Sequence, residues 1–184
     1  MSKKEILNRF AVAEKGEIII DVSANRVKDL YNDFDKTAPY IKKDLEGELV
    51  EYLLGCAREI RRKKFVIRFN IDEPVDEESS KRVKESVSEY FCYLKEVGSR
   101  QIRDMLRRSF FLLFLGLGLL MLYLWVNRIT VSMENVFVQI IAPGLTVVAW
   151  VSLWEAIATF LIQWRTKRKE IGLCERISGV DIKF

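Results

Sequence analysis

Two long apolar stretches dominate the second half of the chain, at residues 109–126 and 136–164. The first has no charged residue, and its length of about 18 residues corresponds to roughly 27 Å of helix, close to the thickness of the hydrocarbon core of a membrane. The second is longer and contains one ionisable residue, Glu155. A connector at 127–135 joins them. The pattern predicts a hairpin of two transmembrane helices.

Basic residues lie beside the outer ends of both stretches, whereas the connector carries only Arg128 against Glu134. Because basic residues are enriched on the cytoplasmic side of membranes, we expect both chain termini in the cytoplasm and the connector outside. The same side chains are candidates for contact with anionic lipid headgroups. They are Arg103, Arg107 and Arg108 before the first stretch, and Arg165, Lys167 and Arg168 after the second.

The N-terminal part contains patterns typical of two strands and one helix. Residues 17–22 form a short β-branched run, and residues 65–72 alternate between apolar and polar positions, so both are predicted as strands. Between them, apolar residues recur every three or four positions over 40–60, which predicts an amphipathic helix. Thr37 is a suitable cap and Pro39 suits a first helical turn, so the helix is expected to begin there.

A long helix is predicted after the second strand, because Pro74 and the acidic residues that follow it suit a first helical turn. Its apolar stripe resumes beyond Gly98-Ser99, so residues 99–108 are expected to form a helical stalk that leads into the membrane. Residues 1–98 would then form a cytoplasmic α+β domain with the element order β-α-β-α.

The basic tail at 165–184 allows two interpretations. Its last apolar residues, Val180, Ile182 and Phe184, alternate with charged ones, as in a half-buried strand. The tail would then add a third strand to the edge of the N-terminal sheet. Alternatively, it is a peripheral segment on the membrane surface.

Glu155 belongs to a polar stripe in the second apolar stretch. An ionisable side chain near a membrane usually faces protein or water, so the stripe suggests a polar helix contact or the wall of a water-filled path. If the two stretches pair residue for residue, Glu155 lies at the cytoplasmic interface; if the span begins at Pro143-Gly144, it lies near the midplane. The stripe consists of Ser152, Glu155, Thr159 and Gln163, which share one helical face.

Gly116 and Gly118 are the only small residues in the interior of the first apolar stretch. Small side chains allow close approach of helices in membranes, where apolar surfaces gain little from pairing with one another. We therefore expect these glycines to pack helices, and we expect the chain to form a homo-oligomer through the small and polar faces of its hairpin.

The rest of the composition excludes several classes of site. The net charge is +4, and the one compact basic run, 61–64, is more typical of a solvated turn or a lipid contact than of a nucleic-acid site. There is no histidine, and the three cysteines share no metal-ligand spacing, so no metal, cofactor or disulfide framework is expected. Acids at 73–78 are explained by the helix start. Nothing points to an enzyme.

The segments SEYFCYL, WVSLWEAI and VDIKF, with the order of the elements, resemble a family of small bacterial two-span membrane proteins with a cytoplasmic α/β domain. The resemblance implies an inner-membrane location and this topology, but no activity and no site residues. Ala156, Ile157 and Ala158 stand in a stretch where family members have a proline and a second acidic residue. This departure argues against a catalytic or transport role for the WVSLWEAI block.

The sequence is compatible with two functions. We favour a non-enzymatic, membrane-anchored interaction or assembly module that self-associates and presents its α+β domain to a cytoplasmic protein partner. The alternative is a subunit of an oligomeric channel or transport complex that uses the polar stripe around Glu155. A single hairpin cannot enclose a pore, so the alternative requires several copies or a larger partner.

Overall fold

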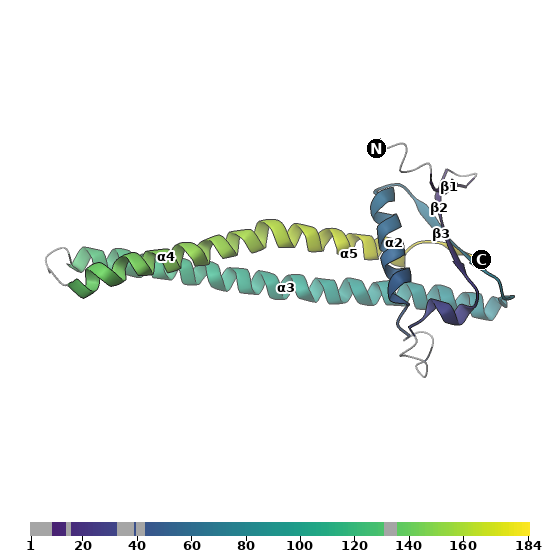
Figure 1. Cartoon of the computed structure of the whole chain (residues 1–184), viewed down its shortest axis with the longest axis horizontal. Coiled ribbons are helices and arrows are strands. Elements are labelled where there is room, and N and C mark those ends of the chain that lie inside the picture. Colours follow the sequence, from purple (N-terminus) through teal and green to yellow (C-terminus); the bar gives the residue numbers. More distant parts are fainter. Residues whose placement is uncertain (1–8, 14–15, 33–38, 40–42, 131–135) are drawn as a thin grey trace. The chain divides into compact units, whose positions relative to one another are not determined.

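The computed structural model describes residues 9–13, 16–32, 39, 43–130 and 136–184 (Figure 1). Over these residues the fold is mixed α+β, with a four-stranded sheet and two long apolar helices. The chain divides into two units. Unit 1 contains Met1–Val97 and Glu170–Phe184, and unit 2 contains Gly98–Lys169. Unit 2 is thus inserted in the sequence of unit 1.

The sheet of unit 1 has the strand order β1-β2-β3-β4. β2 (Ile18–Ala24) and β3 (Phe65–Ile71) pair in parallel over their whole length, with the 3-10 helix η1 (Val27–Leu30) and helix α2 (Gly47–Ile60) in the connection between them. A parallel pair needs such a crossover because a tight turn can join only antiparallel strands. The strands predicted at 17–22 and 65–72 are thus confirmed as β2 and β3, with shifts of one or two residues at their ends.

The edges of the sheet are two short strands. β1 (Ala11–Val12) pairs antiparallel with β2, and it was not expected from the sequence. β4 (Ile182–Lys183) pairs in parallel with β3, so the strand interpretation of the C-terminal tail is confirmed. Ile182 is 3% exposed, which fits its place in a half-buried strand.

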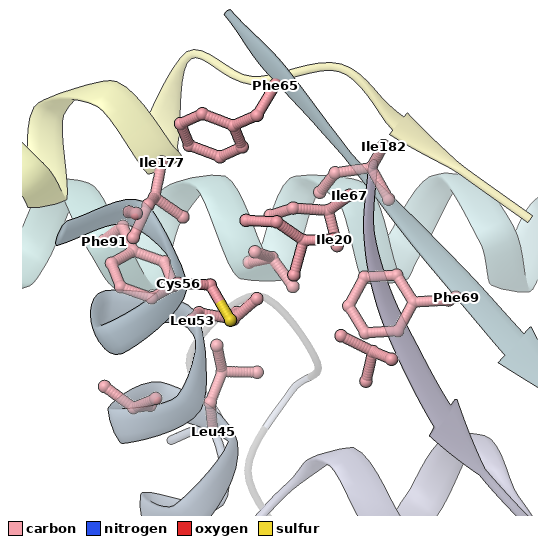
Figure 2. Packing of buried hydrophobic residues seen from close by; sticks show 14 of the residues in the cluster. Ile20, Leu45, Leu53, Cys56, Phe65, Ile67, Phe69, Phe91, Ile177 and Ile182 are labelled. Carbon is pink, nitrogen blue, oxygen red and sulfur yellow. The ribbon is translucent and has the colours of Figure 1, made fainter. Parts of the chain in front are cut away.

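The core of unit 1 lies between one face of the sheet and its helices (Figure 2). β2 and β3 contribute alternate residues, as the two-residue period of a strand requires. The helices add residues from α2, from α3 (Glu77–Thr130) and from α5 (Trp164–Ser178). The central side chains include Ile20, Ile67, Phe69, Leu53, Phe91 and Ile177.

Helix α2 begins at Gly47, so the predicted start near Tyr40 is wrong for residues 43–46. Leu45 forms an isolated bridge with Tyr31, and the Glu46 N–H donates to the Leu30 carbonyl. These bonds hold the segment in an extended conformation because its backbone groups are already paired outside a helix. Pro39 is not helical, and Thr37 lies outside the described residues.

Helix α3 begins three residues after Pro74 and runs without interruption through Gly98 and Ser99. Asp76 caps it: its carbonyl accepts the Ser80 N–H, and its carboxylate accepts the Ser79 N–H at 3.4 Å. Hydrogen bonding to Ser79, mainly through its side chain and less through its backbone N–H, holds the pKa of the Asp76 carboxyl below its usual value. An acidic residue at the helix start is therefore explained by capping.

Two helices are long and apolar enough to cross a membrane, in agreement with the two predicted stretches. The first candidate is Glu77–Arg128, within α3, and the second is Pro143–Ser178, which continues from α4 (Val136–Ala158) through a π-helical turn, η4 (Thr159–Gln163), into α5. The helix therefore extends to Ser178 in the tail, where the sequence analysis expected no helix. Connector residues 131–135 lie outside the described residues.

Candidate functional site

All the predicted site residues belong to unit 2, where α3 and α4 form an antiparallel hairpin (Figure 1). The Ser109 hydroxyl donates a 2.8 Å hydrogen bond to the Ala156 carbonyl, and both residues are buried. A second contact joins Gly116 to Ala149. Ser109 and Gly116 are as many residues apart on α3 as Ala149 and Ala156 are on α4. This equality fixes the register of the hairpin over the intervening turns.

Gly116 lies where the two helices approach each other closely. A Cβ atom added to it would lie 2.8 Å from Cγ of Leu153 and 3.1 Å from the carbonyl oxygen of Ala149. Since even a methyl group would collide, only glycine fits without a shift of the Leu153 side chain or of the backbone at Ala149. Gly116 therefore packs one helix of the hairpin against the other.

Small residues line the rest of this contact. On α4 and η4 they recur at intervals of three and four residues, and on α3 they are seven residues apart, as expected for helices that pack at a shallow angle. Close approach at small residues is a main source of helix attraction inside membranes. We call this set the seam: Ser109, Gly116, Ala149, Ser152, Ala156 and Thr159, all buried.

The predicted polar stripe is divided between two environments. Ser152 and Thr159 lie in the seam, and the Ser152 hydroxyl donates to the Val148 carbonyl of its own helix. Glu155 and Gln163 are exposed on the outer surface of the hairpin. The four residues therefore do not form one continuous polar surface.

Glu155 is level with Phe110, as the register of the hairpin requires. It precedes Ala156 directly, just as Arg108 precedes Ser109 on the other helix. Within the described part of the chain, the Glu155 carboxylate forms no hydrogen bond or ion pair. Its exposed neighbours Val151 and Trp154 are apolar, so the carboxylate lies on an apolar surface.

Gly118 differs from Gly116. A Cβ atom at Gly118 would have no neighbour within 4 Å, so this residue lies on the open surface of the hairpin. The structure thus separates two glycines that the sequence analysis treated together. Only Gly118 remains available for contact with another molecule.

The π turn η4 is a feature that sequence reasoning missed. Its extra residue is accommodated by a hydrogen bond from the Trp164 N–H to the Thr159 carbonyl. The rings of Phe160 and Trp164 stack with their centroids 5.7 Å apart, and the Arg168 guanidinium lies 5.1 Å from the Trp164 ring centroid. No propensity rule marks a π turn, although two aromatics four residues apart are compatible with stacking on a helix.

The predicted headgroup residues are accessible, with one exception. Arg103, Arg107, Arg108, Arg165 and Arg168 are exposed, whereas Lys167 is half-buried. By the register of the hairpin, Arg107 and Arg108 lie just beyond the level of Glu155. The basic residues on the two helices therefore gather at the same end of unit 2.

Two of the open grooves in the described part of unit 1 were not suggested by the sequence. One, of about 330 Å³, includes the basic residues Arg62, Lys63 and Lys64 but also Glu17 and Asp181, so it has no uniform charge. Arg176 beside it is already used: its guanidinium donates to the carbonyls of Arg61 and Lys63.

The second groove, of about 390 Å³, lies between α3 and β4 and is again of mixed charge. The described residues contain no cluster of side chains suited to a metal ion. The two serine hydroxyls that line the second groove, those of Ser88 and Ser178, donate to the backbone carbonyls of Ser178 and Glu175, so neither hydroxyl is hydrogen-bonded to a base. The grooves therefore give no reason to assign a reaction to unit 1.

Two thiols are enclosed in the core of unit 1. Cys56 lies on α2 and Cys174 on α5, and burial raises the pKa of both above the usual value for a thiol. A raised pKa keeps the thiol protonated and unreactive at neutral pH. They act as small core residues.

Comparison of the chain with protein-family models, with curated proteins and with solved structures finds no match.

Proposed function

We propose that the chain is an integral membrane protein whose hairpin crosses the bilayer twice. The apolar windows of the two candidate helices have mean hydropathies of 2.3 and 1.9, yet only 11% and 22% of their residues are buried. The apolar core helix of a soluble protein would be buried on most sides. So much exposed apolar surface is costly in water and favourable in lipid.

The charges support one orientation. The basic residues that flank the apolar segments of α3 and of the α4–α5 helix lie at the same end of unit 2, and such residues are enriched on the cytoplasmic side of membranes. We infer that unit 1 is cytoplasmic and that the connector is external. Glu155, level with Phe110 and less than one helical turn from the levels of Arg107 and Arg108, would then lie at the cytoplasmic interface, where anionic lipid headgroups can also bind the arginines.

The function we propose is that of a non-enzymatic assembly module. The single observation that carries it is the seam, because the hairpin closes its own small-residue face and leaves a bulky, apolar outer surface around an unpaired carboxylate. Such a surface fits lipid and a neighbouring helix better than a small ligand. Self-association of the hairpin would present several copies of unit 1 to a cytoplasmic protein partner.

The second candidate, a subunit of an oligomeric channel, is favoured only by the exposure of Glu155 and Gln163. Several copies would have to arrange these two residues around a path. Ser152 and Thr159 would contribute little to it, because they face the seam.

The test is purification in lipid nanodiscs after extraction from membranes, followed by mass measurement and an ion-flux assay in liposomes. The assembly module predicts that the protein resists alkaline carbonate extraction and forms oligomers without flux. Release by carbonate would contradict a spanning hairpin. A monomer would contradict the assembly role, and flux that Glu155→Gln abolishes would favour the channel.

A further inference from the structure

We propose that two copies of the hairpin pack face to face about a twofold axis, so that Glu155 of each copy pairs with Arg108 of the other. This inference rests on the proposed spanning and self-associating hairpin and names the surface that it uses. The face concerned, called here the charged face, consists of Arg108, Phe111 and Leu115 on α3, and Gly144, Val148, Val151 and Glu155 on α4.

The two charges share one side of the hairpin for a geometric reason. Ser109 and Ala156 contact each other across the seam, and each is preceded by a charged residue, Arg108 or Glu155. In two antiparallel helices, the residues that directly precede a pair of contacting residues turn to the same side. The carboxylate and the guanidinium therefore lie on one face at nearly the same level.

Neither charge is paired within the described chain. Both side chains are exposed, and no hydrogen bond or ion pair joins either one to another described residue. An ionisable side chain among apolar neighbours at the edge of a membrane span still costs free energy, and it usually turns to protein or water. A partner that brings the opposite charge to the same depth would remove part of that cost.

A second copy supplies this partner by symmetry. Both copies must keep the same orientation in the membrane, so the twofold axis runs along the membrane normal. Rotation about that axis places α4 of one copy opposite α3 of the other, with levels unchanged. Glu155 then faces the partner's Arg108, and Arg108 faces the partner's Glu155.

The shapes of the two helices suit this arrangement. On α4 the charged face carries small or β-branched residues, and a Cβ atom at Gly144 would meet nothing within 4 Å. On α3 the same face carries the bulky Phe111 and Leu115. Bulky side chains of one copy can therefore enter the shallow surface of the other. The opposite side of α4 presents Trp150 and Ile157, which suit lipid contact.

The first arm of the test is charge reversal in the full chain, measured by mass photometry in nanodiscs. Glu155→Arg and Arg108→Glu should each weaken dimerisation by about tenfold, since a polar contact between membrane helices contributes about 1–2 kcal/mol in model peptides. The double variant Glu155→Arg with Arg108→Glu should restore the dimer, because it exchanges the charges across the same interface.

The second arm uses disulfide formation between two differently tagged chains that lack the native cysteines. One chain carries Val151→Cys and the other Leu115→Cys, so any cross-link joins separate copies. The proposal predicts this cross-link, and it predicts much less between Ile157→Cys and Phe110→Cys, which lie on the opposite face. If a charge-reversed chain fails to insert into the membrane, the cross-linking experiment still tests the proposal, because its chains keep Glu155 and Arg108.

The outcomes distinguish a wrong dimer interface from the absence of self-association. Dimers that persist in both single variants and cross-link through Ile157 and Phe110 would overturn the charged face while leaving self-association intact. A monomeric wild-type protein would overturn self-association itself. Charge reversal that lowers hairpin stability but leaves the dimer unchanged would assign the Glu155–Arg108 pair to a single copy and also refute the proposal.

Discussion

The Ser109 hydroxyl and the Ala156 carbonyl oxygen lie 2.8 Å apart, in a hydrogen bond that joins α3 to α4. The bond requires close helices, because a serine side chain is too short to cross a gap between bulky residues. Gly116 provides the same closeness two helical turns further along α3. Together they set the levels of the described residues near these two contacts, including Glu155.

Gly116→Leu should destabilise the hairpin, because the new side chain would start 2.8 Å from Cγ of Leu153. Overpacking of this kind costs about 1–3 kcal/mol. Gly118→Leu is the matched control, since its added atoms enter open space and the gain in helix propensity is the same at both sites. Thermal unfolding of the full chain in mild detergent should show a lower midpoint for Gly116→Leu alone. Equal midpoints would mean that the seam is not closed at Gly116.

The sequence identified the small residues of the first apolar stretch, but it could not assign them to partners. Gly116 and Gly118 differ by two positions, which places them on different sides of a helix, and only the position of the second helix decides which side is covered. For the same reason, the sequence could not show which residues of the polar stripe are covered by the second helix. A seam of finite width covers Ser152 and Thr159 and leaves Glu155 and Gln163 outside.

Ile182→Asp should destabilise unit 1 by a few kcal/mol, because Ile182 is buried against β3 and a charge there would lack a partner. Lys183→Asp is the control, since Lys183 lies in the same strand and is exposed. Limited proteolysis of the full chain should reveal earlier cleavage in the Ile182 variant. Identical digestion of the two variants would mean that β4 is not part of the core.

Arg61→Gly should raise stability by about 1 kcal/mol. Arg61 ends α2 with φ 57° and ψ −115°, a conformation that costs a non-glycine residue about 1–3 kcal/mol. Glycine removes that strain, although its freedom in the unfolded chain offsets about 0.5–1 kcal/mol of the gain. The Arg61 carbonyl would still accept the hydrogen bond from Arg176.

Arg62→Gly is the control for this prediction. Arg62 does not have a positive φ, so its replacement should lower the unfolding midpoint while Arg61→Gly raises it. A lower midpoint for both variants would show that the backbone at Arg61 is not strained.

Stability should fall at alkaline pH partly because of Cys56 and Cys174, whose pKa values are raised by burial. The stabilising effect is complete below the unfolded thiol pKa of about 8.5. Above it the unfolded chain loses thiol protons first, so the free energy of unfolding decreases as pH rises through the folded pKa values. The double variant Cys56→Ala, Cys174→Ala should lose less stability between about pH 8 and 10. Parallel pH curves would contradict this account.

The strands were predictable because their signals are local. Alternation over 65–72 corresponds to β3, and alternation near Ile182 corresponds to β4. The start of α2 was not predictable, because the bridge between Leu45 and Tyr31 is a tertiary contact that overrides the helical pattern. β1 has only two residues, too few to show a period.

Cysteine labelling in intact cells is the decisive test of a hairpin that crosses the membrane with unit 1 in the cytoplasm. The native thiol of Cys92 is exposed on unit 1 and serves as the cytoplasmic probe. Met133→Cys serves as the connector probe, in a second chain whose native cysteines are replaced. A membrane-impermeant maleimide should label residue 133 in intact cells and Cys92 only after permeabilisation. Labelling of residue 133 only after permeabilisation, or of Cys92 in intact cells, would contradict this topology.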